Sequence, residues 1–567
     1  MSVLDSYNRW LNSSKVSEEY KKLLKNMTNE DIDDAFFKNI EFGTGGMRGV
    51  LGPGTNRLNE FTVTKASVGF AKYLLEKYEN VKTDGVVISH DNRHMSREFT
   101  LLTAKVLSEF GIKVYIFDAL RPTPELSYAV RRMKASGGIM ITASHNPKEH
   151  NGYKVYDETG CQLVPEKIAR LLEIIDSLPN ELEVEYTPVA QLGEIITLPA
   201  EIDDEYVELV KSVTLNNDLN KKGFKIVFTP NHGTAYVNGM RVFNELGYDI
   251  YPLLCQCNPD PNFSNTLSPN PEDTKAFIEP IKYAKEIGAH LIVMTDPDGD
   301  RCGLAYLDND GEYKTLTGNQ SAAMLMDYIF SVRKERGLLH DNGVMYNTIV
   351  TSALGEAVAT HYGVKTEQFL TGFKFIGDRI GYYESIGEEH FFEFGYEESY
   401  GCLIADFVRD KDAIQAIVMY SEMALYYHLQ GKNLGDVWND LGKRFGCHID
   451  ELYSVYFKGS KGQEIMTNIM NSLRNDPFIT LDGIKVVKVE DYVRLISTEL
   501  GKESTTLNYP MSDVIKLYFE DKSTIALRPS GTEAKLKTYI GTVDTTYELA
   551  KEKVKTLYTA IQKLLNI

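Results

Sequence analysis

The fold is decided by the stretch Gly137-Gly-Ile-Met-Ile-Thr-Ala-Ser-His-Asn-Pro147. Its apolar, β-branched centre lies between glycines and an Asn-Pro pair, which predicts a buried strand that ends in a tight turn. Pro147 disfavours helical geometry at Asn146, so the turn is stiff. Ser144 therefore follows the carboxyl end of a strand, the edge at which α/β sheets bind ligands. Taken alone, a Ser-His pair is more typical of an ordinary polar turn.

The order strand, polar turn, helix recurs along the chain. Strands are predicted over residues 85–90, 138–142, 225–229, 291–295 and 344–351, and helices over 62–80, 237–246 and 354–361. This alternation over residues 40–430 indicates stacked α/β units. Strands predicted at 483–488 and 514–519 precede a last helix over 547–565, an order that indicates a smaller α+β domain.

The predicted fold class is α/β: three α/β domains with mixed sheets and a smaller C-terminal α+β domain, arranged around a central cleft. The chain has 567 residues, which is too long for a single core. Residues 1–40 are charged and helical in pattern, so we expect an amphipathic arm that packs on the first domain. The expected domains, with the arm included in the first, are 1–205, 206–316, 317–436 and 437–567.

Composition excludes several classes of function. The net charge of −19 argues against general nucleic-acid binding and against an anionic membrane surface. No run approaches the roughly 18 apolar residues of a membrane span, and the N-terminus has no signal-peptide character. The six cysteines are sparse, and the close pair Cys255 and Cys257 is interpreted as incidental. A cytoplasmic protein without nucleic-acid or membrane partners is expected.

An acidic loop follows the predicted strand 291–295. Asp296, Asp298 and Asp300 alternate with Pro and Gly before Arg301, and three carboxylates this close repel one another unless a cation joins them. An EF-hand is excluded, because it needs Gly at the sixth position of the loop and Glu at the twelfth. A haloacid-dehalogenase-like phosphatase also places Asp-x-Asp after a strand, but Asp300 stands where Thr is expected. The all-oxygen ligand set favours Mg²⁺.

Three further stretches combine glycines with charged or hydroxyl groups. Residues 42–49 hold four glycines and Arg48, which suits a backbone cradle for phosphate. Residues 395–401 place two glutamates and a serine between glycines, as sugar hydroxyls require. Residues 527–533 end a strand with a guanidinium, two hydroxyls and a glycine, the groups that bind a phosphate monoester. Each stretch alone could be a surface turn.

In combination these stretches resemble the α-D-phosphohexomutase superfamily over nearly the full chain. The resemblance rests on four motifs in the family's order, at residues 142–147, 296–301, 395–399 and 528–532. The arm, the 42–49 loop and the segment 372–377 are similar to the bacterial phosphoglucomutase branch, and also to the phosphoglucomutase-2/phosphopentomutase branch of animals.

The resemblance implies that Ser144 is phosphorylated in the active enzyme. Its phosphoryl group would pass to a sugar monophosphate to give a 1,6-bisphosphate, and the other phosphate would return to Ser144. The implied metal ion is Mg²⁺, with ligands from Ser144, Asp296, Asp298 and Asp300. Phosphoserine, three carboxylates and Mg²⁺ sum to a charge of about −3, so compensating cations are expected, namely Arg48, Lys154 and Arg301.

Two residues are implied to transfer protons on opposite sides of the sugar. Lys154 matches the family's candidate general base, and among other cations its pKa is expected to fall far below the usual value. His145 is the rival base, or it orients the serine turn. On the other side, some members have a histidine where this chain has Gly401, and Lys411 resembles the equivalent residue of the glucose-specific branch.

The remaining motif residues are implied to bind substrate: Arg301, Lys374, Glu397, Ser399, Arg528, Ser530, Gly531 and Thr532. The last four would clamp the non-transferring phosphate, so substrate binding is expected to close the last domain and exclude water. The implied reaction interconverts α-glucose 1-phosphate and glucose 6-phosphate, with glucose 1,6-bisphosphate as activator and intermediate. A phosphomannomutase, a phosphopentomutase, a metal-dependent sugar phosphatase and a non-catalytic sugar-phosphate sensor remain alternatives. The oligomeric state, monomer or dimer, is left open.

Overall fold

A computed structural model of the chain describes all residues except 1, 44–45, 388–389, 458–460, 530–534 and 566–567. The chain forms two compact units. Unit 1 contains residues 1–317 and 372–429, and unit 2 contains residues 318–371 and 430–567. In the described part of the chain, none of the helices has the length and apolar character needed to span a membrane.

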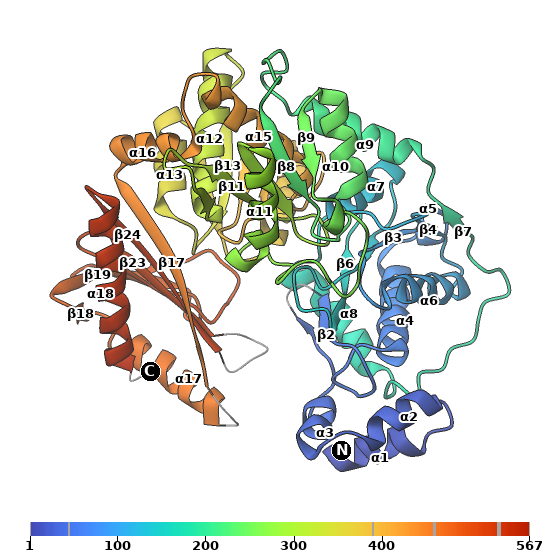
Figure 1. The fold of residues 1–567 in the computed structure, drawn as a ribbon. Helices are drawn as coiled ribbons and strands as arrows, with labels where there is room; N and C mark the ends of the chain where they lie inside the picture. The colour runs from blue at the N-terminus through green and yellow to red at the C-terminus, as the bar shows by residue number, and fades with distance from the viewer. Residues whose placement is uncertain (1, 44–45, 388–389, 458–460, 530–534, 566–567) are drawn as a thin grey trace. The chain divides into compact units, whose positions relative to one another are not determined.

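Unit 1 begins with a mixed seven-stranded sheet of order β1-β2-β6-β5-β3-β4-β7 (Figure 1). Its strands are β1 Phe42–Gly43, β2 Gly46–Val50, β3 Val86–His90, β4 Val114–Ile116, β5 Gly138–Ile141, β6 His150–Tyr156 and β7 Ile195–Thr197. Strands β5, β3, β4 and β7 are parallel, and β1, β2 and β6 are antiparallel to their neighbours. The helices of this domain are α4 Glu60–Lys77, α5 Val81–Asp84, α6 Ser96–Glu109, α7 Thr123–Met133 and α8 Pro165–Ser177.

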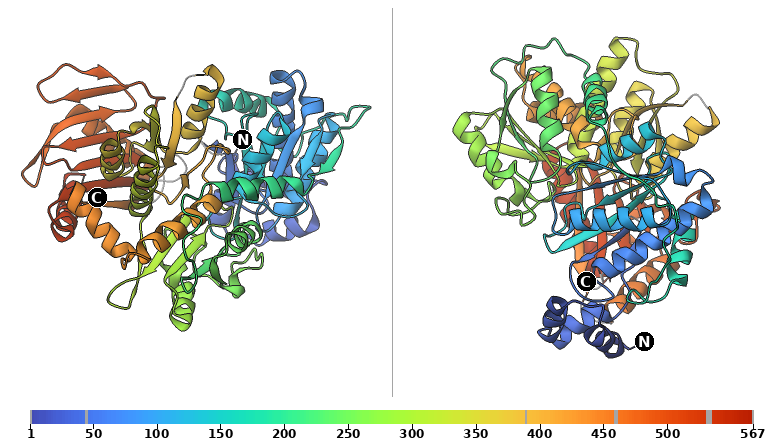
Figure 2. Two further views of the ribbon diagram at one scale, coloured as in Figure 1. Left: turned by 90° about the horizontal axis from the view of Figure 1, so that it is seen from above. Right: turned by 90° about the vertical axis from the view of Figure 1, so that its right-hand side faces the viewer.

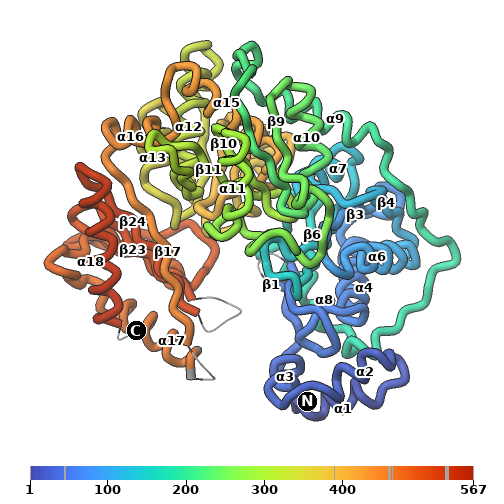
Figure 3. Tube along the Cα trace, in the orientation of Figure 1, coloured from blue at the N-terminus to red at the C-terminus, as the bar shows by residue number. Residues whose placement is uncertain are grey.

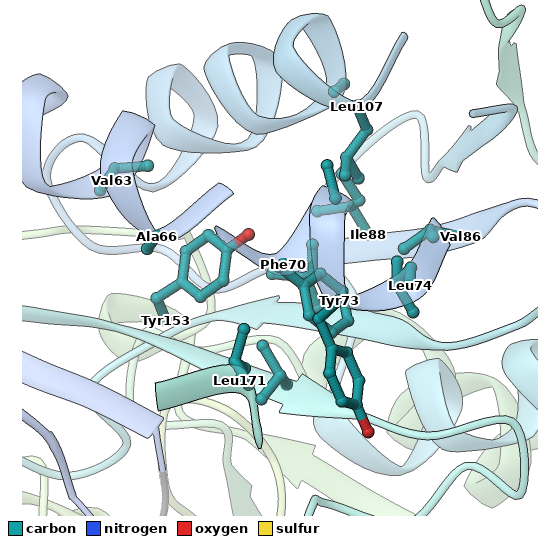
Figure 4. Close-up of a cluster of buried hydrophobic side chains, with 14 of the residues drawn as sticks. Val63, Ala66, Phe70, Tyr73, Leu74, Val86, Ile88, Leu107, Tyr153 and Leu171 are labelled. Carbon is teal, nitrogen blue, oxygen red and sulfur yellow. The ribbon is translucent and has the colours of Figure 1, made fainter. Parts of the chain in front are cut away.

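Helix α4 illustrates how the sequence builds this domain. Asn59 caps the helix, and the Thr62 side chain accepts the Asn59 N–H in return, so two otherwise unpaired donors are satisfied. The helix buries Phe70 in a core that also contains Ile88 of β3 and Tyr153 of β6 (Figure 4). This shared core fixes the central strands of the sheet relative to one another.

The expected N-terminal arm is confirmed as three short helices, α1 Val3–Asn12, α2 Glu18–Lys25 and α3 Asn29–Phe36. They group together at one end of the first domain (Figure 2, dark blue). Trp10 is fully buried, and its Nε1 donates a hydrogen bond of 2.7 Å to Glu181. The arm is therefore anchored to the segment that follows α8.

The connection between α8 and α9 runs along the outer edge of the first domain (Figure 3). It includes β7, which pairs in parallel with β4. No strand was predicted in this connection from the sequence. The strand was missed because its three residues are exposed or half-buried and show no buried apolar pattern.

The second sheet of unit 1 has the order β12-β11-β10-β8-β9. Its strands are β8 Lys225–Thr229, β9 Asp249–Pro252, β10 Leu291–Thr295, β11 Cys302–Leu307 and β12 Tyr313–Leu316. Around it lie α9 Glu201–Ser212, α10 Tyr236–Leu246 and α11 Ile278–Ile287, with short 3₁₀ turns η1 Leu254–Gln256 and η2 Thr274–Phe277. Unit 1 ends with α14 Lys374–Ile386, β15 Phe391–Tyr396, β16 Cys402–Leu403 and α15 Ala413–His428. Every residue of β10 is buried, so the acidic loop begins from a rigid strand.

Unit 2 combines an α/β part with the C-terminal sheet. The α/β part contains α12 Gly318–Glu335, β13 Gly343–Thr348, α13 Ala353–Tyr362, β14 Lys365–Phe369 and α16 Leu434–Phe445. The antiparallel C-terminal sheet contains β17 Cys447–Tyr456, β18 Thr480–Leu481, β19 Ile484–Asp491, β20 Ile496–Glu499, β21 Thr505–Thr506, β22 Ile515–Phe519, β23 Thr524–Pro529 and β24 Lys535–Asp544. Helices α17 Lys461–Asn475 and α18 Tyr547–Leu565 share one hydrophobic core with this sheet. The predicted smaller α+β domain is confirmed.

Candidate active site

Ser144 lies three residues after β5 and is 3% exposed. Its Oγ donates a hydrogen bond of 3.0 Å to Asp296 Oδ2 and lies 3.1 Å from His145 Nδ1. Strands β5 and β10 belong to different sheets, so the structure joins two carboxyl strand ends at one point. The serine hydroxyl and the acidic loop thus form a single site within unit 1.

The acidic loop has the geometry of a cation site. Asp296 Oδ1 accepts the backbone N–H groups of Asp300 and Arg301, each at 3.0 Å, and one oxygen from each of Asp296, Asp298 and Asp300 lies within 4.8 Å of the others. Oδ1 of Asp298 and Oδ1 of Asp300 are buried and have no hydrogen-bond partner among the described residues. Buried carboxylate oxygens normally have partners, so this donor set fits a divalent cation.

The pKa shifts of the acidic loop also fit a bound cation. Burial, and then repulsion from Asp298 and Asp300, raises the pKa of Asp296 well above its usual value. Burial also opposes ionisation of Asp298, but Lys154 and Lys411 more than offset this and lower its pKa. Asp296 and Asp298 are thus driven in opposite directions, and a bound cation would remove the repulsion.

Lys154 lies in β6 beside Met140 of β5. Its Nζ lies 2.8 Å from Asp298 Oδ2 and 3.7 Å from Asp300 Oδ2. Burial lowers the pKa of Lys154, but these two carboxylates outweigh burial and the net direction is upward. The expected fall in pKa is therefore not found, because carboxylates rather than cations are the nearest charges.

Lys411 also reaches the acidic loop. Its Nζ lies 3.1 Å from Asp300 Oδ2, 3.1 Å from Asp410 Oδ1 and 3.8 Å from Glu397 Oε2. A Cβ placed on Gly401 would lie 2.0 Å from Lys411 Cδ. The lysine side chain therefore fills the space that a side chain at position 401 would need.

The segment 395–401 is tied to its neighbours by backbone hydrogen bonds. Glu397 Oε1 accepts the Gly372 N–H at 2.9 Å, and the Tyr400 carbonyl accepts the N–H of Cys302, which begins β11. Ser399 is half-buried. The structure thus brings segment 395–401 next to the acidic loop and to the start of segment 372–377.

Four more expected residues lie in unit 1. Arg48 of β2 donates to Asn146 Oδ1 at 3.2 Å, and Arg301 pairs with Glu272. Burial, followed by the charges of Arg301 and Arg48, lowers the pKa of His145 well below its usual value, which favours the neutral imidazole. Burial lowers the pKa of Lys374, at the start of α14, to about 8.

The expected phosphate clamp is only partly described. Arg528 lies near the end of β23, in unit 2, and is half-buried. Ser530, Gly531 and Thr532 lie outside the described residues.

Sequence reasoning missed Asp91 and Arg93, which follow β3. Thr142 Oγ1 donates to Asp91 Oδ2 at 2.6 Å, and Arg93 Nη2 donates to the Ser144 carbonyl at 2.6 Å. Both residues are buried. The available signal was a polar turn at the carboxyl end of a strand, but no sequence pattern indicates which loop that turn contacts.

Three family models match the chain in succession. They are Phosphoglucomutase/phosphomannomutase, alpha/beta/alpha domain I over residues 39–181, domain II over 204–310 and domain III over 317–445. The prediction of three α/β domains ahead of the C-terminal domain is confirmed. The exact four-domain boundaries stay a prediction.

Curated relatives cover almost the whole chain. A phosphoglucomutase of Staphylococcus epidermidis (strain ATCC 12228) is 38% identical over 554 residues, covering 96% of this chain and 98% of the relative. A phosphoglucomutase of Staphylococcus aureus (strain USA300) is 36% identical over 530 residues, covering 92% and 93%.

Solved structures share the fold at low identity. A phosphoglucomutase/phosphomannomutase family protein of Burkholderia thailandensis has a TM-score of 0.66 at 18% identity, with 93% of this chain and 97% of that chain covered. The open form of the Paramecium phosphoglucomutase pp63/parafusin has a TM-score of 0.67 at 18% identity, with 93% and 94% covered. With three matched domains and relatives above one-third identity over almost its full length, this chain belongs to the phosphoglucomutase/phosphomannomutase family of the α-D-phosphohexomutase superfamily.

Proposed function

We propose that this protein is a phosphoglucomutase that interconverts α-glucose 1-phosphate and glucose 6-phosphate through a phosphorylated Ser144. The observation that supports this most directly is the 3.0 Å contact between Ser144 Oγ and Asp296, beside two buried carboxylate oxygens that have no hydrogen-bond partner in the described part of the chain. The identity of 36–38% to curated phosphoglucomutases supports the choice of glucose. Glucose 1,6-bisphosphate is the intermediate and the activator.

The acidic loop is the metal site of this proposal. Asp296, Asp298 and Asp300 would hold Mg²⁺, which supplies positive charge to the phosphoryl group on Ser144 during transfer. Arg48 and Arg301 add fixed positive charge nearby. His145, held neutral, presents Nδ1 to the Ser144 hydroxyl at 3.1 Å and so orients it. This favours orientation of the serine over the alternative role of general base.

Proton transfer is assigned to the two lysines. When the phosphoryl group leaves Ser144, the serine oxygen gains a proton from the Lys154 ammonium as the P–O bond to serine breaks. A new P–O bond forms to the sugar hydroxyl, whose proton passes to Lys411. The roles reverse when the second phosphate returns to Ser144. The carboxylates around each lysine raise its pKa and favour the ammonium, which suits the lysine that donates a proton in each half-reaction. The lysine that accepts the proton must be the free amine, so Lys411 is deprotonated when Lys154 is the donor, and the reverse holds in the second half-reaction.

Glu397 and Ser399 are proposed to bind sugar hydroxyls, with Lys374 nearby. Arg528, Ser530, Gly531 and Thr532 are proposed to bind the phosphate that is not being transferred. Because one clamp binds each of the two phosphates in turn, the bisphosphate intermediate must reorient between the two half-reactions. Water must be excluded meanwhile, or phosphoserine would be hydrolysed.

The test is Ser144→Ala, assayed with glucose 1-phosphate, a trace of glucose 1,6-bisphosphate and Mg²⁺. The variant should lose nearly all turnover and all phosphorylation of the intact protein, while the dissociation constant for substrate stays within a few-fold of wild type. Retained turnover would remove the phosphoenzyme from the mechanism. In wild type, a chelator should abolish transfer and added Mg²⁺ should restore it.

Product analysis separates the alternatives. A mutase yields glucose 6-phosphate, a sugar phosphatase yields inorganic phosphate, and a sensor yields neither. Mannose and ribose monophosphates assayed in parallel distinguish phosphomannomutase and phosphopentomutase activity. A cytoplasmic location stays a prediction, as does the absence of nucleic-acid partners.

A further inference from the structure

Ser144 has a left-handed backbone conformation, with a φ of 53°. For a residue other than glycine this conformation is unfavourable and persists only where neighbouring groups impose it. The neighbours that impose it belong to the loop after β3. That loop lies about fifty residues earlier in the sequence, and the proposed mechanism assigns it no role.

Arg93 is the centre of this contact. Its guanidinium donates hydrogen bonds to four carbonyl oxygens of the loop between β5 and β6: those of Ser144 at 2.6 Å, Asn146, Pro147 at 2.8 Å and His150 at 3.0 Å. Arg93 as a whole residue is 3% exposed. It also lies over the Phe263 ring, 5.2 Å from its centroid.

Asp91 completes the arrangement. Its carboxylate lies 3.2 Å from Arg93 Nε and accepts hydrogen bonds from the Arg93 N–H at 2.9 Å and from Thr142 Oγ1 at 2.6 Å. Thr142 Oγ1 in turn accepts the Ser144 N–H at 2.8 Å. The peptide groups on both sides of Ser144 are therefore held, the N–H through Thr142 and the carbonyl through Arg93.

Only a planar, multiply donating cation meets these demands. A guanidinium presents five N–H donors in a fixed plane, whereas an ammonium is a point charge with three donors. Four carbonyls and one carboxylate surround Arg93, so a lysine would leave several buried acceptors unpaired. Such acceptors cost free energy and would let the loop relax.

We propose that Arg93 is the positioning residue that sets the orientation of Ser144 for phosphoryl transfer, acting through the four carbonyls of its loop. This inference rests on the proposed role of Ser144. Arg93 touches the loop backbone and not the reacting atoms, so its removal should slow transfer while leaving substrate affinity largely unchanged. A displacement of about 1 Å at a reacting atom can reduce the rate about 100-fold.

The experiment compares Arg93→Lys and Arg93→Ala with the control Arg97→Ala. Arg97 follows on α6 and donates to the carbonyl of Phe117, away from the serine loop. Each variant is phosphorylated with glucose 1,6-bisphosphate, and transfer to glucose 1-phosphate is followed in a single turnover. We expect the transfer rate to fall about 100-fold in both Arg93 variants, with KM within about threefold of wild type. Free guanidinium should restore part of the rate to Arg93→Ala only.

Melting temperature and circular dichroism identify variants that fail to fold, and Arg93→Lys keeps the charge beside Asp91 if the alanine variant unfolds. A folded Arg93→Lys variant with a wild-type transfer rate would overturn the proposal. The proposal would also be overturned if guanidinium did not restore the transfer rate and if the smaller fraction of folded protein accounted for the whole decrease in rate. If wild type itself is never phosphorylated, the proposed function fails, a result distinct from failure of the Arg93 assignment.

Discussion

At the scale of single residues, the position of the Lys411 side chain depends on Gly401. Lys411 reaches Asp300 and Glu397 only because position 401 has no side chain, since a Cβ there would lie 2.0 Å from Lys411 Cδ. Lys411 is also held by Asp410, which accepts a hydrogen bond from Tyr156 at 3.1 Å. The placement of the sugar-side lysine therefore depends on the smallest residue of segment 395–401.

Replacing Gly401 by alanine should displace Lys411 from the acidic loop. We expect kcat to fall about 100-fold with a smaller change in KM, because the ammonium would no longer reach the transferring oxygen. Steady-state kinetics with glucose 1-phosphate measure both constants. Gly381→Ala is the matched control, because a Cβ at Gly381 would meet Thr159 only at 3.8 Å. Equal kcat for Gly401→Ala and wild type would show that Lys411 has no part in proton transfer.

Part of the site could be predicted from sequence, for a physical reason. Ser144 and Asp296 both follow short apolar strands, and the carboxyl ends of such strands are where α/β domains bind ligands. Arg93 could not be predicted, because its role depends on a loop that folding brings next to it. The direction of the Lys154 pKa was also beyond reach, since it depends on Asp298 being its nearest charge.

At the scale of elements, the periodic segments were predictable and the contacts between them were not. The last helix, Tyr547–Leu565, matches its predicted range because its apolar residues repeat at helical spacing. Strand β7 escaped notice because it is held by pairing with β4 and not by a buried pattern of its own. Contacts between elements of unit 2 depend likewise on side chains that sequence patterns do not pair.

One such contact joins β22 to the end of β13. Lys516 of β22 is 7% exposed, and its Nζ donates a hydrogen bond of 2.7 Å to the carbonyl of Ile349. Burial lowers the pKa of Lys516 to about 8, below the value of about 10.4 for an unfolded chain. Between these two values the unfolded state binds more protons, so the free energy of unfolding should rise with pH.

Lys516→Met should remove this dependence. Between about pH 8 and pH 10, the free energy of unfolding of wild type should rise more steeply with pH than that of the variant. The difference should reach up to about 1.4 kcal/mol per pH unit. The chain has two tryptophans, so in a Trp10→Phe background the fluorescence of Trp438 in α16 reports unit 2 alone. Urea midpoints at several pH values give the comparison. Lys485→Met, which removes an exposed lysine of β19, is the control; an identical slope in Lys516→Met and wild type would contradict the assignment.

At the scale of the whole molecule, the described site and the expected phosphate clamp belong to different compact units. Ser144, the acidic loop, Lys154, Lys411 and Glu397 lie in unit 1, whereas Arg528 lies in unit 2. The chain passes between the units at residues 317–318, 371–372 and 429–430. The phosphate clamp proposed at Arg528 can therefore be tested separately from the site in unit 1.

Arg528→Ala tests this clamp through binding. A guanidinium–phosphate hydrogen bond contributes about 1.5–3 kcal/mol, so the dissociation constant for glucose 6-phosphate should rise about 10- to 100-fold. The measurement is best made by calorimetry in the Ser144→Ala background, where no turnover consumes the ligand. Arg494→Ala serves as the control, because it removes the same charge from the turn between β19 and β20, beside Asp491. An unchanged dissociation constant in Arg528→Ala would place the phosphate elsewhere.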